Sequence, residues 1–234
     1  MAKLWSNDVR FYFGGYDVGT ATTTVGLTLA YAPLDVTALG DSGERMIAGI
    51  RQDVAEWGGI FDDSLSADAA ASALLGTGTN NVIQVHLGTG TGAIGYASTA
   101  LMVFHKAVAS KSELVASEGE WKVDGKWSRG QVLLSKTTYT GSASSGATDG
   151  TALSTGTSAL FLQVFSQTGA GSGTFSLESA ATATGVYTAF ATLTGGTATK
   201  SYIVTATGSL DRFTRITKTA TGTIALAAIV VRNY

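Results

Sequence analysis

Short alternating stretches separated by glycine run through most of the chain and constrain its fold more than any other feature. Threonine alternates with valine, isoleucine and phenylalanine in many of these stretches, and such alternation is typical of strands with one buried face. Glycine supplies 30 of the 234 residues and proline only one, so turns are frequent while proline seldom interrupts a strand. These features predict a mainly β protein.

The composition narrows the class of protein further. With no cysteine, the chain has no disulfides, no thiolate zinc site and no cysteine nucleophile, which fits assembly in a reducing cytoplasm. Only 14% of residues are charged, against roughly 25% in an average soluble domain. A membrane helix does not explain this deficit, because the longest apolar run, 224–231, has strand length and a span needs about 20 residues. Ser, Thr and Gly can solvate a surface without charge, but the deficit also indicates a surface partly covered by other subunits.

Strands are expected in two groups, with one helix between strands of the first. The helix is expected at about 64–75, where Asp62, Asp63 and Ser64 can cap an Ala/Leu-rich body that ends before Gly76. A turn is expected at 32–34. The expected strands lie near 9–16, 24–32, 53–61, 81–87, 96–109, 159–167, 173–180, 186–194, 199–207, 211–218 and 223–232.

A β-hairpin is expected at 118–128, because Asp124-Gly125 suits the central positions of a type I′ turn. Further on, residues 141–158 consist almost entirely of Gly, Ser, Thr and Ala, which is typical of a linker or long loop. The predicted division is therefore a β domain over 1–140, a linker over 141–158 and a small antiparallel β-sandwich over 159–234.

No group of residues points to catalysis, a cofactor or a metal ion. Gly90–Gly95 matches G-x-G-x-x-G, but β-branched and aromatic residues follow it where a dinucleotide site needs a helix, so a loop is expected. His86 and His105 lack the spacing of a metal site. The Trp121 and Trp127 rings suit cross-strand packing, with a sugar-binding platform as the alternative. The chain is expected not to be an enzyme.

The charge distribution says more than the net charge of −2. Residues 8–68 hold ten acidic and three basic residues, a local balance of −7. Neither value suits a dedicated nucleic-acid-binding protein. An acidic stretch is usually a solvated face, and it gains interest only if the protein forms a channel.

Residues 34–51 and 54–63 resemble the major tail proteins of long-tailed bacteriophages, which form the tail tube. The similarity lies in a Gly-Asp pair after a Val-Thr stretch, a following arginine, a glycine with a basic residue, and a glycine–aromatic–aspartate segment before a short helix. Residues 159–164, 173–179 and 211–216 are similar to the second β unit of many such proteins, although Leu177-Glu178-Ser179 stands where Gln-Ser-Ser is usual. The residues that match the first motif are Leu39, Gly40, Asp41, Arg45, Gly49, Arg51, Gly59, Phe61 and Asp62.

This resemblance implies a tail-tube-type, two-sheet β-sandwich or barrel with one short flanking helix, plus a C-terminal antiparallel β-sandwich on the tube exterior. It implies rings, commonly hexameric, that stack into a hollow tube in the virion after synthesis in the host cytoplasm. The implied partners are further copies of the chain, a tape-measure protein, tail terminator and tip proteins, and DNA in non-specific transit, with no membrane.

Two expectations about the tube follow from the acidic stretch and from weakly patterned segments. If 9–61 supplies the inner sheet, Asp41, Asp53 and Glu56 are candidate lumen-facing residues that would repel DNA phosphates. Residues 1–8 and 33–53 are candidates for arms between stacked rings, because they are polar and extended. The alternative functions are a capsid decoration protein or tail terminator, and a carbohydrate-binding or adhesin β module.

Overall fold

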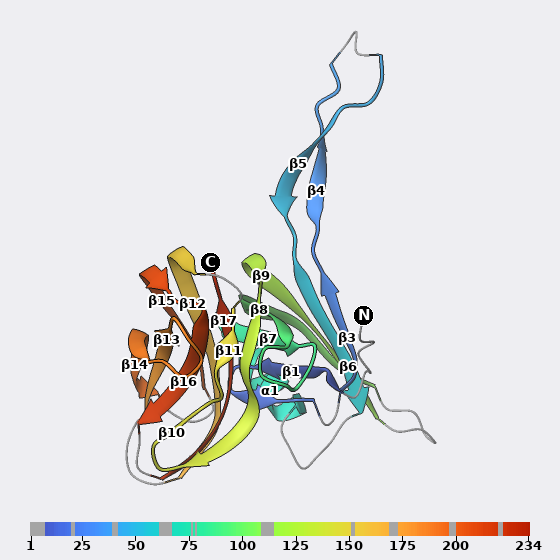
Figure 1. Ribbon diagram of the computed structural model, residues 1–234. Helices are drawn as coiled ribbons and strands as arrows, with labels where there is room; N and C mark the ends of the chain where they lie inside the picture. The colour runs from blue at the N-terminus through green and yellow to red at the C-terminus, as the bar shows by residue number, and fades with distance from the viewer. Residues whose placement is uncertain are drawn as a thin grey trace.

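The computed structural model shows a β-rich body from which one long two-stranded ribbon projects (Figure 1). It describes residues 8–19, 22–38, 42–60, 67–75, 77, 79–108, 115–150, 153–168, 173–196, 200–219 and 222–234. The prediction of a mainly β fold with one short helix is confirmed. Within these residues, no helix combines the length and the apolar character needed to cross a membrane.

The elements of the first half of the chain include the projecting ribbon and the helix. They are β1 (Arg10–Phe13), β2 (Tyr16–Asp17), β3 (Thr22–Thr28), β4 (Tyr31–Asp35), β5 (Met46–Arg51), β6 (Val54–Ile60), α1 (Ala67–Leu74), β7 (Asn81–His86), β8 (Ile94–Val108) and β9 (Ala116–Thr140). The second half contains only strands: β10 (Ala143–Ser144), β11 (Thr148–Asp149), β12 (Ser154–Thr168), β13 (Gly173–Ala180), β14 (Thr188–Gly196), β15 (Lys200–Leu210), β16 (Phe213–Thr219) and β17 (Thr223–Val231).

The largest sheet joins the two halves of the chain through β9. Its main order is β15-β12-β17-β9-β8-β7-β1-β2, and β6 with β3 extends it from β9. Residues 116–122 of β9 pair with β6, whereas residues 131–140 pair with β17. The division into 1–140 and 159–234 remains a prediction, and the structure adds that the two predicted units share one sheet. Within the predicted linker, β10 and β11 pair with β16.

Three hydrophobic clusters lie against this sheet. The first fills the N-terminal half, where Phe13 packs on Trp121 with ring centroids 4.7 Å apart. The second lies between the large sheet and the five-stranded sheet β10/β11-β16-β13-β14, around Leu160, Leu162 and Phe175. The third, around Phe161 and other fully buried side chains, lies on the opposite face of β12 and β17.

The hairpin predicted at 118–128 is wrong, because β9 runs without reversal from Ala116 to Thr140. Gly125 to Trp127 instead form a bulge: Thr99 of β8 lies opposite Asp124, and Ala97 lies opposite Ser128. Gly125 has φ 93°, so the Asp-Gly signal did mark a positive φ angle, but that angle serves a bulge. Trp121 and Trp127 therefore lie on one strand, and both rings are buried.

Of the smaller predictions, two differ from the structure and two are confirmed. The turn predicted at 32–34 is strand β4, whose proline is tolerated because β4 pairs on one side only. The strand predicted at 9–16 is divided into β1 and β2 by Gly14 and Gly15, both at positive φ. The helix is confirmed over Ala67–Leu74, and the start predicted at 64 lies outside the described residues. The predicted loop is confirmed over 90–93, and Ile94 and Gly95 already belong to strand β8.

Candidate assembly surface

The projecting ribbon, here called the arm, comprises the described residues between Leu29 and Gln52. Its strands β4 and β5 form a sheet of their own, in which Leu34 lies opposite Ile47 and Asp35 opposite Met46. Strands β3 and β6 continue the ribbon into the body, where β6 pairs with β9. The arm therefore extends a sheet of the body into solvent (Figure 1).

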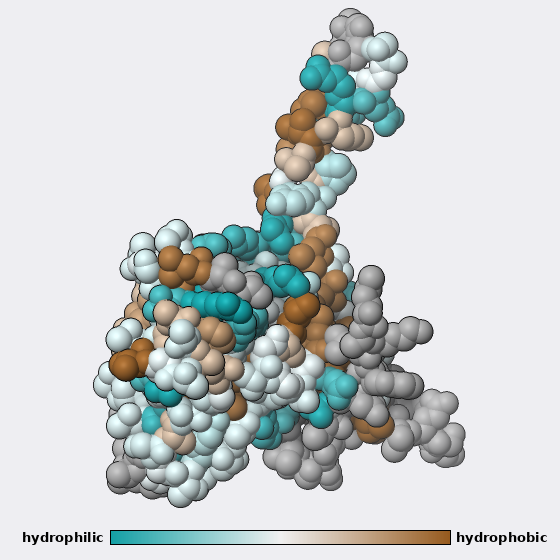
Figure 2. All heavy atoms as spheres, viewed as in Figure 1, coloured by the Kyte–Doolittle hydropathy of each residue, from teal (hydrophilic) through white to brown (hydrophobic). Residues whose placement is uncertain are grey.

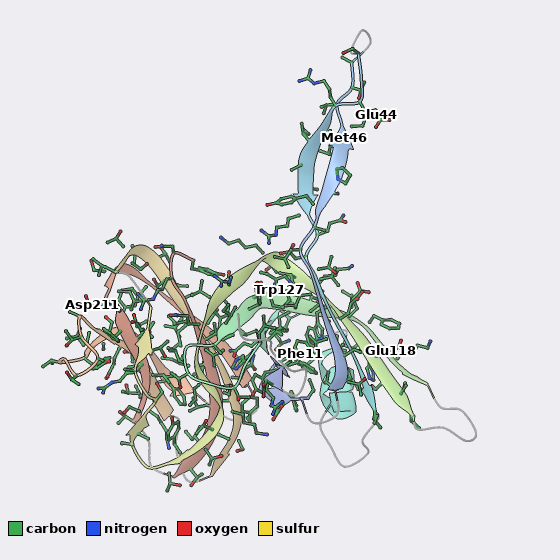
Figure 3. All side chains as sticks on the ribbon, turned by 45° about the vertical axis from the view of Figure 1, so that its right-hand side comes forward. Phe11, Glu44, Met46, Glu118, Trp127 and Asp211 are labelled. Carbon is green, nitrogen blue, oxygen red and sulfur yellow. The ribbon has the colours of Figure 1, made fainter. Side chains whose placement is uncertain are left out.

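Large apolar side chains are concentrated on this arm. It carries seven of the fifteen exposed large hydrophobic residues in the described part of the chain. Figure 2 shows apolar residues on the middle and lower parts of the arm, and Met46, labelled on the arm in Figure 3, is exposed. A two-stranded ribbon has no core and is marginal alone, and contiguous exposed apolar surface typically marks a binding site. The seven residues are Leu29, Tyr31, Leu34, Val36, Met46, Ile47 and Ile50.

A β-bulge in β5 gives the arm its most exposed apolar side chain. Ala48 lies opposite Pro33 and Arg51 opposite Tyr31, so β5 holds one residue more than β4 over this interval. A Cβ atom at Gly49 would collide with the carbonyl oxygen of Ala32 and with Leu34, which explains why the motif has glycine there. Next to Gly49, Ile50 is 78% exposed.

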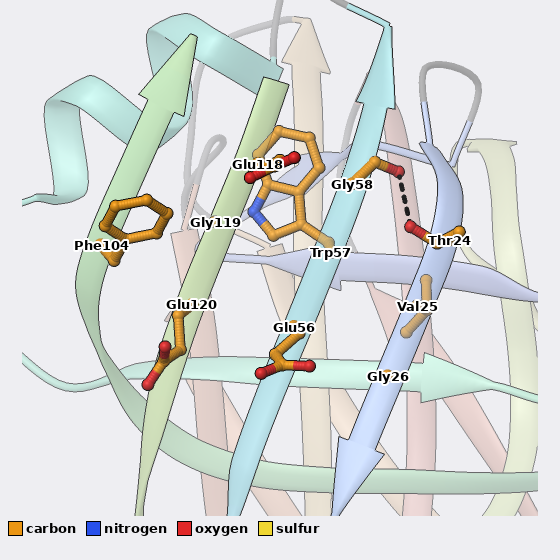
Figure 4. Close-up of a pocket in the computed structure, with 10 residues that line it drawn as sticks. All are labelled: Thr24, Val25, Gly26, Glu56, Trp57, Gly58, Phe104, Glu118, Gly119 and Glu120. Atoms are coloured by element: carbon orange, nitrogen blue, oxygen red, sulfur yellow. Dashed lines mark hydrogen bonds between the residues drawn. The ribbon is translucent and has the colours of Figure 1, made fainter. Parts of the chain in front are cut away.

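A second open surface lies at the base of the arm, on the outer face of β3, β6, β9 and β8. Glu56 of β6 lies directly opposite Glu120 of β9, and Gly58 lies opposite Glu118. These three carboxylates border a shallow groove of about 410 Å³ with a glycine-rich floor and the ring of Phe104 at its side (Figure 4). The other face of the same strands carries Trp57 and Trp121 in the first hydrophobic cluster.

The outer face carries less net negative charge than the count of −7 over residues 8–68 suggested. Lys106 of β8 lies opposite Glu118, and Lys122 binds Glu120 with Nζ 2.6 Å from Oε1. Three carboxylates and two ammonium groups leave an excess of one negative charge. Like charges directly opposite one another, as in Glu56 and Glu120, destabilise a sheet, so local stability does not account for their placement.

The candidate lumen residues have different positions in the structure. Glu56 is exposed on the outer face just described. Asp53 does not fit the expectation of a lumen-facing charge, because its carboxylate is fully buried and bound to Arg51 at 2.7 Å. Asp41 lies outside the described residues. Glu118 and Glu120 were missed because they were assigned to a hairpin; their alternation with Gly119 was the available signal.

The motif residues fall on the arm and at its base. Arg45, Gly49 and Arg51 lie on the returning half of the arm, and Gly59 lies in β6 opposite Ser117. The structure brings Arg51 to Asp53 and gives Gly49 a steric role. The remaining motif residues, Leu39, Gly40, Asp41, Phe61 and Asp62, lie outside the described part of the chain.

The two histidines lie in the body, away from the arm. His86 is fully buried, with Nε2 3.0 Å from Gln84 Oε1 and Nδ1 3.2 Å from Ser135 Oγ. Burial lowers the pKa of His86 from 6.5 to about 3, because an imidazolium ion would lose its hydration there. His105 Nε2 lies 3.1 Å from Ser117 Oγ. Among the described residues, no group of three His, Asp or Glu side chains could hold a metal ion.

Comparison with known proteins gives only distant similarities. No protein-family model matches the sequence, and no curated protein matches it. A chain from the virion of a native gene transfer agent particle is 16% identical, with 47% of this chain and 84% of that chain covered and a TM-score of 0.40. A chain from the tail of an empty gene transfer agent particle, refined with C6 symmetry, is 16% identical, with 54% and 98% covered and a TM-score of 0.43.

The third similar structure is the Dit protein of phage SPP1, described as a paradigm of the hub adsorption apparatus in phages that infect Gram-positive bacteria. It is 13% identical, with 95% of this chain and 98% of that chain covered and a TM-score of 0.35. All three TM-scores lie below 0.5.

Proposed function

We propose that this chain is the structural, non-enzymatic subunit of a phage tail tube, which polymerises into stacked rings around a channel for the genome. The observation that carries the proposal is a four-stranded segment, β3-β6-β9-β8, with an arm projecting from it. The sequence resemblance over 34–63 supports the same proposal, since the described residues of that segment, 34–38 and 42–60, lie in the arm and at its base.

Both edges of the four-stranded segment offer a place for another strand. In the described part of the chain, β3 pairs with β6 alone. At the other edge, β8 pairs with β7 only as far as Ala100. Beyond that point, Leu101–Phe104 have β9 on one side and no second strand among the described residues. Such sheet edges pair readily with other chains.

The direction of the strands makes a cyclic assembly possible. Each neighbouring pair within β3-β6-β9-β8 is antiparallel, so β3 and β8 run in opposite directions. When copies are related by rotation about a common axis, β8 of one copy meets β3 of the next in an antiparallel pair. This contact joins two different surfaces and closes into a ring when the rotation closes. The resulting wall would be a continuous antiparallel barrel.

The arm then has a natural place between rings. It leaves the segment along the strand direction (Figure 1), roughly parallel to the axis of such a barrel. Its seven exposed apolar side chains would be covered by a subunit of the adjacent ring, which removes apolar surface from water. This agrees with the expectation that 33–53 bridges stacked rings, although that expectation assumed a polar segment and the structure has five exposed large apolar side chains within it. Such an assembly would also explain the low charge content, because interfaces in permanent assemblies are larger and more apolar than those in transient complexes.

The outer face with Glu56, Glu118 and Glu120 is proposed to line the channel. With the first hydrophobic cluster on the opposite face of these strands, this is the face that remains open to solvent. Its excess of one negative charge per subunit, repeated around each ring, would repel phosphate groups weakly and keep DNA from adhering. The C-terminal β unit is proposed to lie on the outside of the tube.

Negative-stain electron microscopy of the purified chain tests this proposal. Hollow filaments of uniform width are expected at high protein concentration, and they should be lost when Leu34 and Ile47 of the arm are both changed to serine. Single rings that never stack would favour a tail terminator or another ring-shaped tail component. Monomers under all conditions would contradict the proposal.

A further inference from the structure

One buried carboxylate lies at the joint where the arm meets the body. The ribbon is interrupted between β3 and β4 at 29–30 and between β5 and β6 at 52–53. At this joint Gln52 N–H donates to the carbonyl oxygen of Ala30 at 2.8 Å. Asp53 lies here with its side chain fully buried. A break in both strands at the same level is a place where a ribbon can bend.

The Asp53 carboxylate connects three separate segments. Oδ1 accepts a hydrogen bond from the Ala30 N–H at 3.2 Å, on the outgoing strand of the ribbon. Oδ2 binds the guanidinium of Arg51, with Nε and Nη2 each at 2.7 Å, on the returning strand. The same oxygen accepts the Trp127 N–H of β9 at 2.9 Å. One side chain thus fixes both strands of the joint to the body.

The bulge in β9 supplies the donor from the body. Because Gly125 to Trp127 leave the ladder with β8, the Trp127 N–H is available to Asp53. Ser98 Oγ donates to the carbonyl oxygen of Lys126 at 2.8 Å and holds the bulge from the β8 side. The Asp53 carbonyl oxygen accepts the Val123 N–H at 3.1 Å. The Trp127 indole reaches the carbonyl oxygen of Val54 at 3.4 Å.

We infer that Asp53 is a positioning residue that sets the direction of the arm relative to the four-stranded segment. The positioning role does not depend on the proposed function, but its purpose does. In a tube, a fixed arm direction would let the arms of successive subunits meet the next ring. A buried carboxylate with a cation and two N–H donors holds one geometry, and removing it leaves those donors without an acceptor. Asparagine does not replace it, because its NH₂ group would face N–H donors.

The test measures arm direction directly in the unassembled subunit. The chain has no cysteine, so Ser42→Cys at the arm and Val186→Cys in the exposed 181–187 loop of the body accept a pair of spin labels. The labelled protein is diluted into unlabelled protein, so that the distance within one molecule is measured even if copies associate. A single narrow distance distribution is expected for the chain with Asp53.

Asp53→Asn and Asp53→Ala should broaden this distribution and move its maximum, whereas Glu44→Gln, an exposed arm residue, should leave it unchanged. Arg51→Gln keeps the two N–H bonds and should give an intermediate width; it also serves if the Asp53 variants fail to fold. Variants that are less stable to heat yet keep the narrow distribution would overturn the inference, because Asp53 would then only stabilise the fold. The readout needs no filaments, so a failure of the tube proposal would leave this result intact.

Discussion

The arm and the C-terminal sandwich contain the same kinds of apolar side chain in opposite surroundings. Leu162 of β12 is fully buried between two sheets, whereas Leu34 of β4 is 50% exposed on a ribbon with no second layer. The sandwich buries its apolar residues within one chain. Among the described residues, no second layer covers the apolar side chains of the arm. The buried residues of the sandwich therefore stabilise the fold, whereas the exposed residues of the arm are proposed to mediate assembly.

Truncating a leucine in the sandwich should have the largest effect on stability. Leu162→Ala removes a fully buried side chain from the second cluster and leaves a cavity, so we expect a loss of about 2–5 kcal/mol in the free energy of unfolding. Urea unfolding followed by circular dichroism measures this loss. The same substitution at Leu34 is the matched control, and equal losses at both sites would break the comparison.

Adding one methyl group at the base of the arm should cost less. A Cβ atom at Gly119 would collide with the indole of Trp57, so Gly119→Ala should destabilise the fold by roughly 1–3 kcal/mol through overpacking. Gly43, near the arm tip, has open space around it, and Gly43→Ala should change the midpoint of thermal unfolding very little. A Gly119→Ala variant as stable as the parent chain would show that the Trp57 ring can move aside.

Acid should weaken the body through His86. The pKa of His86 is about 3 in the folded chain because of burial, against 6.5 for an exposed histidine. The unfolded chain therefore binds the extra proton between these values. The His86 contribution is complete above pH 6.5 and decreases as the pH falls toward 3, by up to about 1.4 kcal/mol per pH unit. His86→Gln should lose this part of the pH dependence, and parallel stability curves would refute the assignment.

Changing the apolar face of the arm should affect assembly rather than folding. Leu34→Ser with Ile47→Ser alters two exposed, opposed side chains, so the free energy of unfolding of the monomer should change by less than about 0.5 kcal/mol. Sedimentation should show that filaments no longer form. Val186→Ser alters an 88% exposed apolar residue outside the arm and should leave filaments intact. If both variants assemble normally, the arm is not an assembly contact.

Removing two carboxylates from the outer face, which changes its net charge from −1 to +1, should have the smallest effect on stability. Glu56→Gln with Glu118→Gln removes like-charge repulsion near Glu120, and we expect a gain of no more than about 0.5 kcal/mol. Filaments should still form. DNA should pass more slowly in phage particles that carry the variant tube, as measured by the rate of genome ejection. Ejection at an unchanged rate, with these side chains lining the channel, would remove the proposed role of the charge.

Local sequence patterns predicted the positions of many strands but not which strands pair with one another. The alternation in 81–87 predicts β7 nearly to the residue, and the Ala/Leu-rich segment predicts α1. Asp124-Gly125 correctly marks a positive φ angle, yet the same angle suits a hairpin turn or a bulge. Which one forms depends on β8 and Asp53, far away in the sequence. Strand β9 pairs with β6 in its first part and with β17 in its last part, and no local sequence pattern indicates this change of partner.

The candidate surfaces, too, could be predicted only in part from the sequence. Residues 33–53 were expected to be an extended polar arm. Their described part is extended, but it carries exposed large apolar side chains where polar ones were expected. The acidic count over 8–68 did not distinguish Asp53, which is buried in an ion pair, from Glu56, which is exposed. Charge counted along the sequence does not reveal which face of a sheet a side chain occupies. Glu118 and Glu120 join Glu56 only through the pairing of β6 with β9.

Electron cryomicroscopy of assembled protein tests the central claim most directly, because it shows which strands meet between subunits. Our account predicts a hollow filament in which β3 of one copy pairs antiparallel with Leu101–Phe104 of its neighbour, and each arm contacts the adjacent ring. A filament in which these two edges stay apart, or in which the arm is left in solvent, would contradict it.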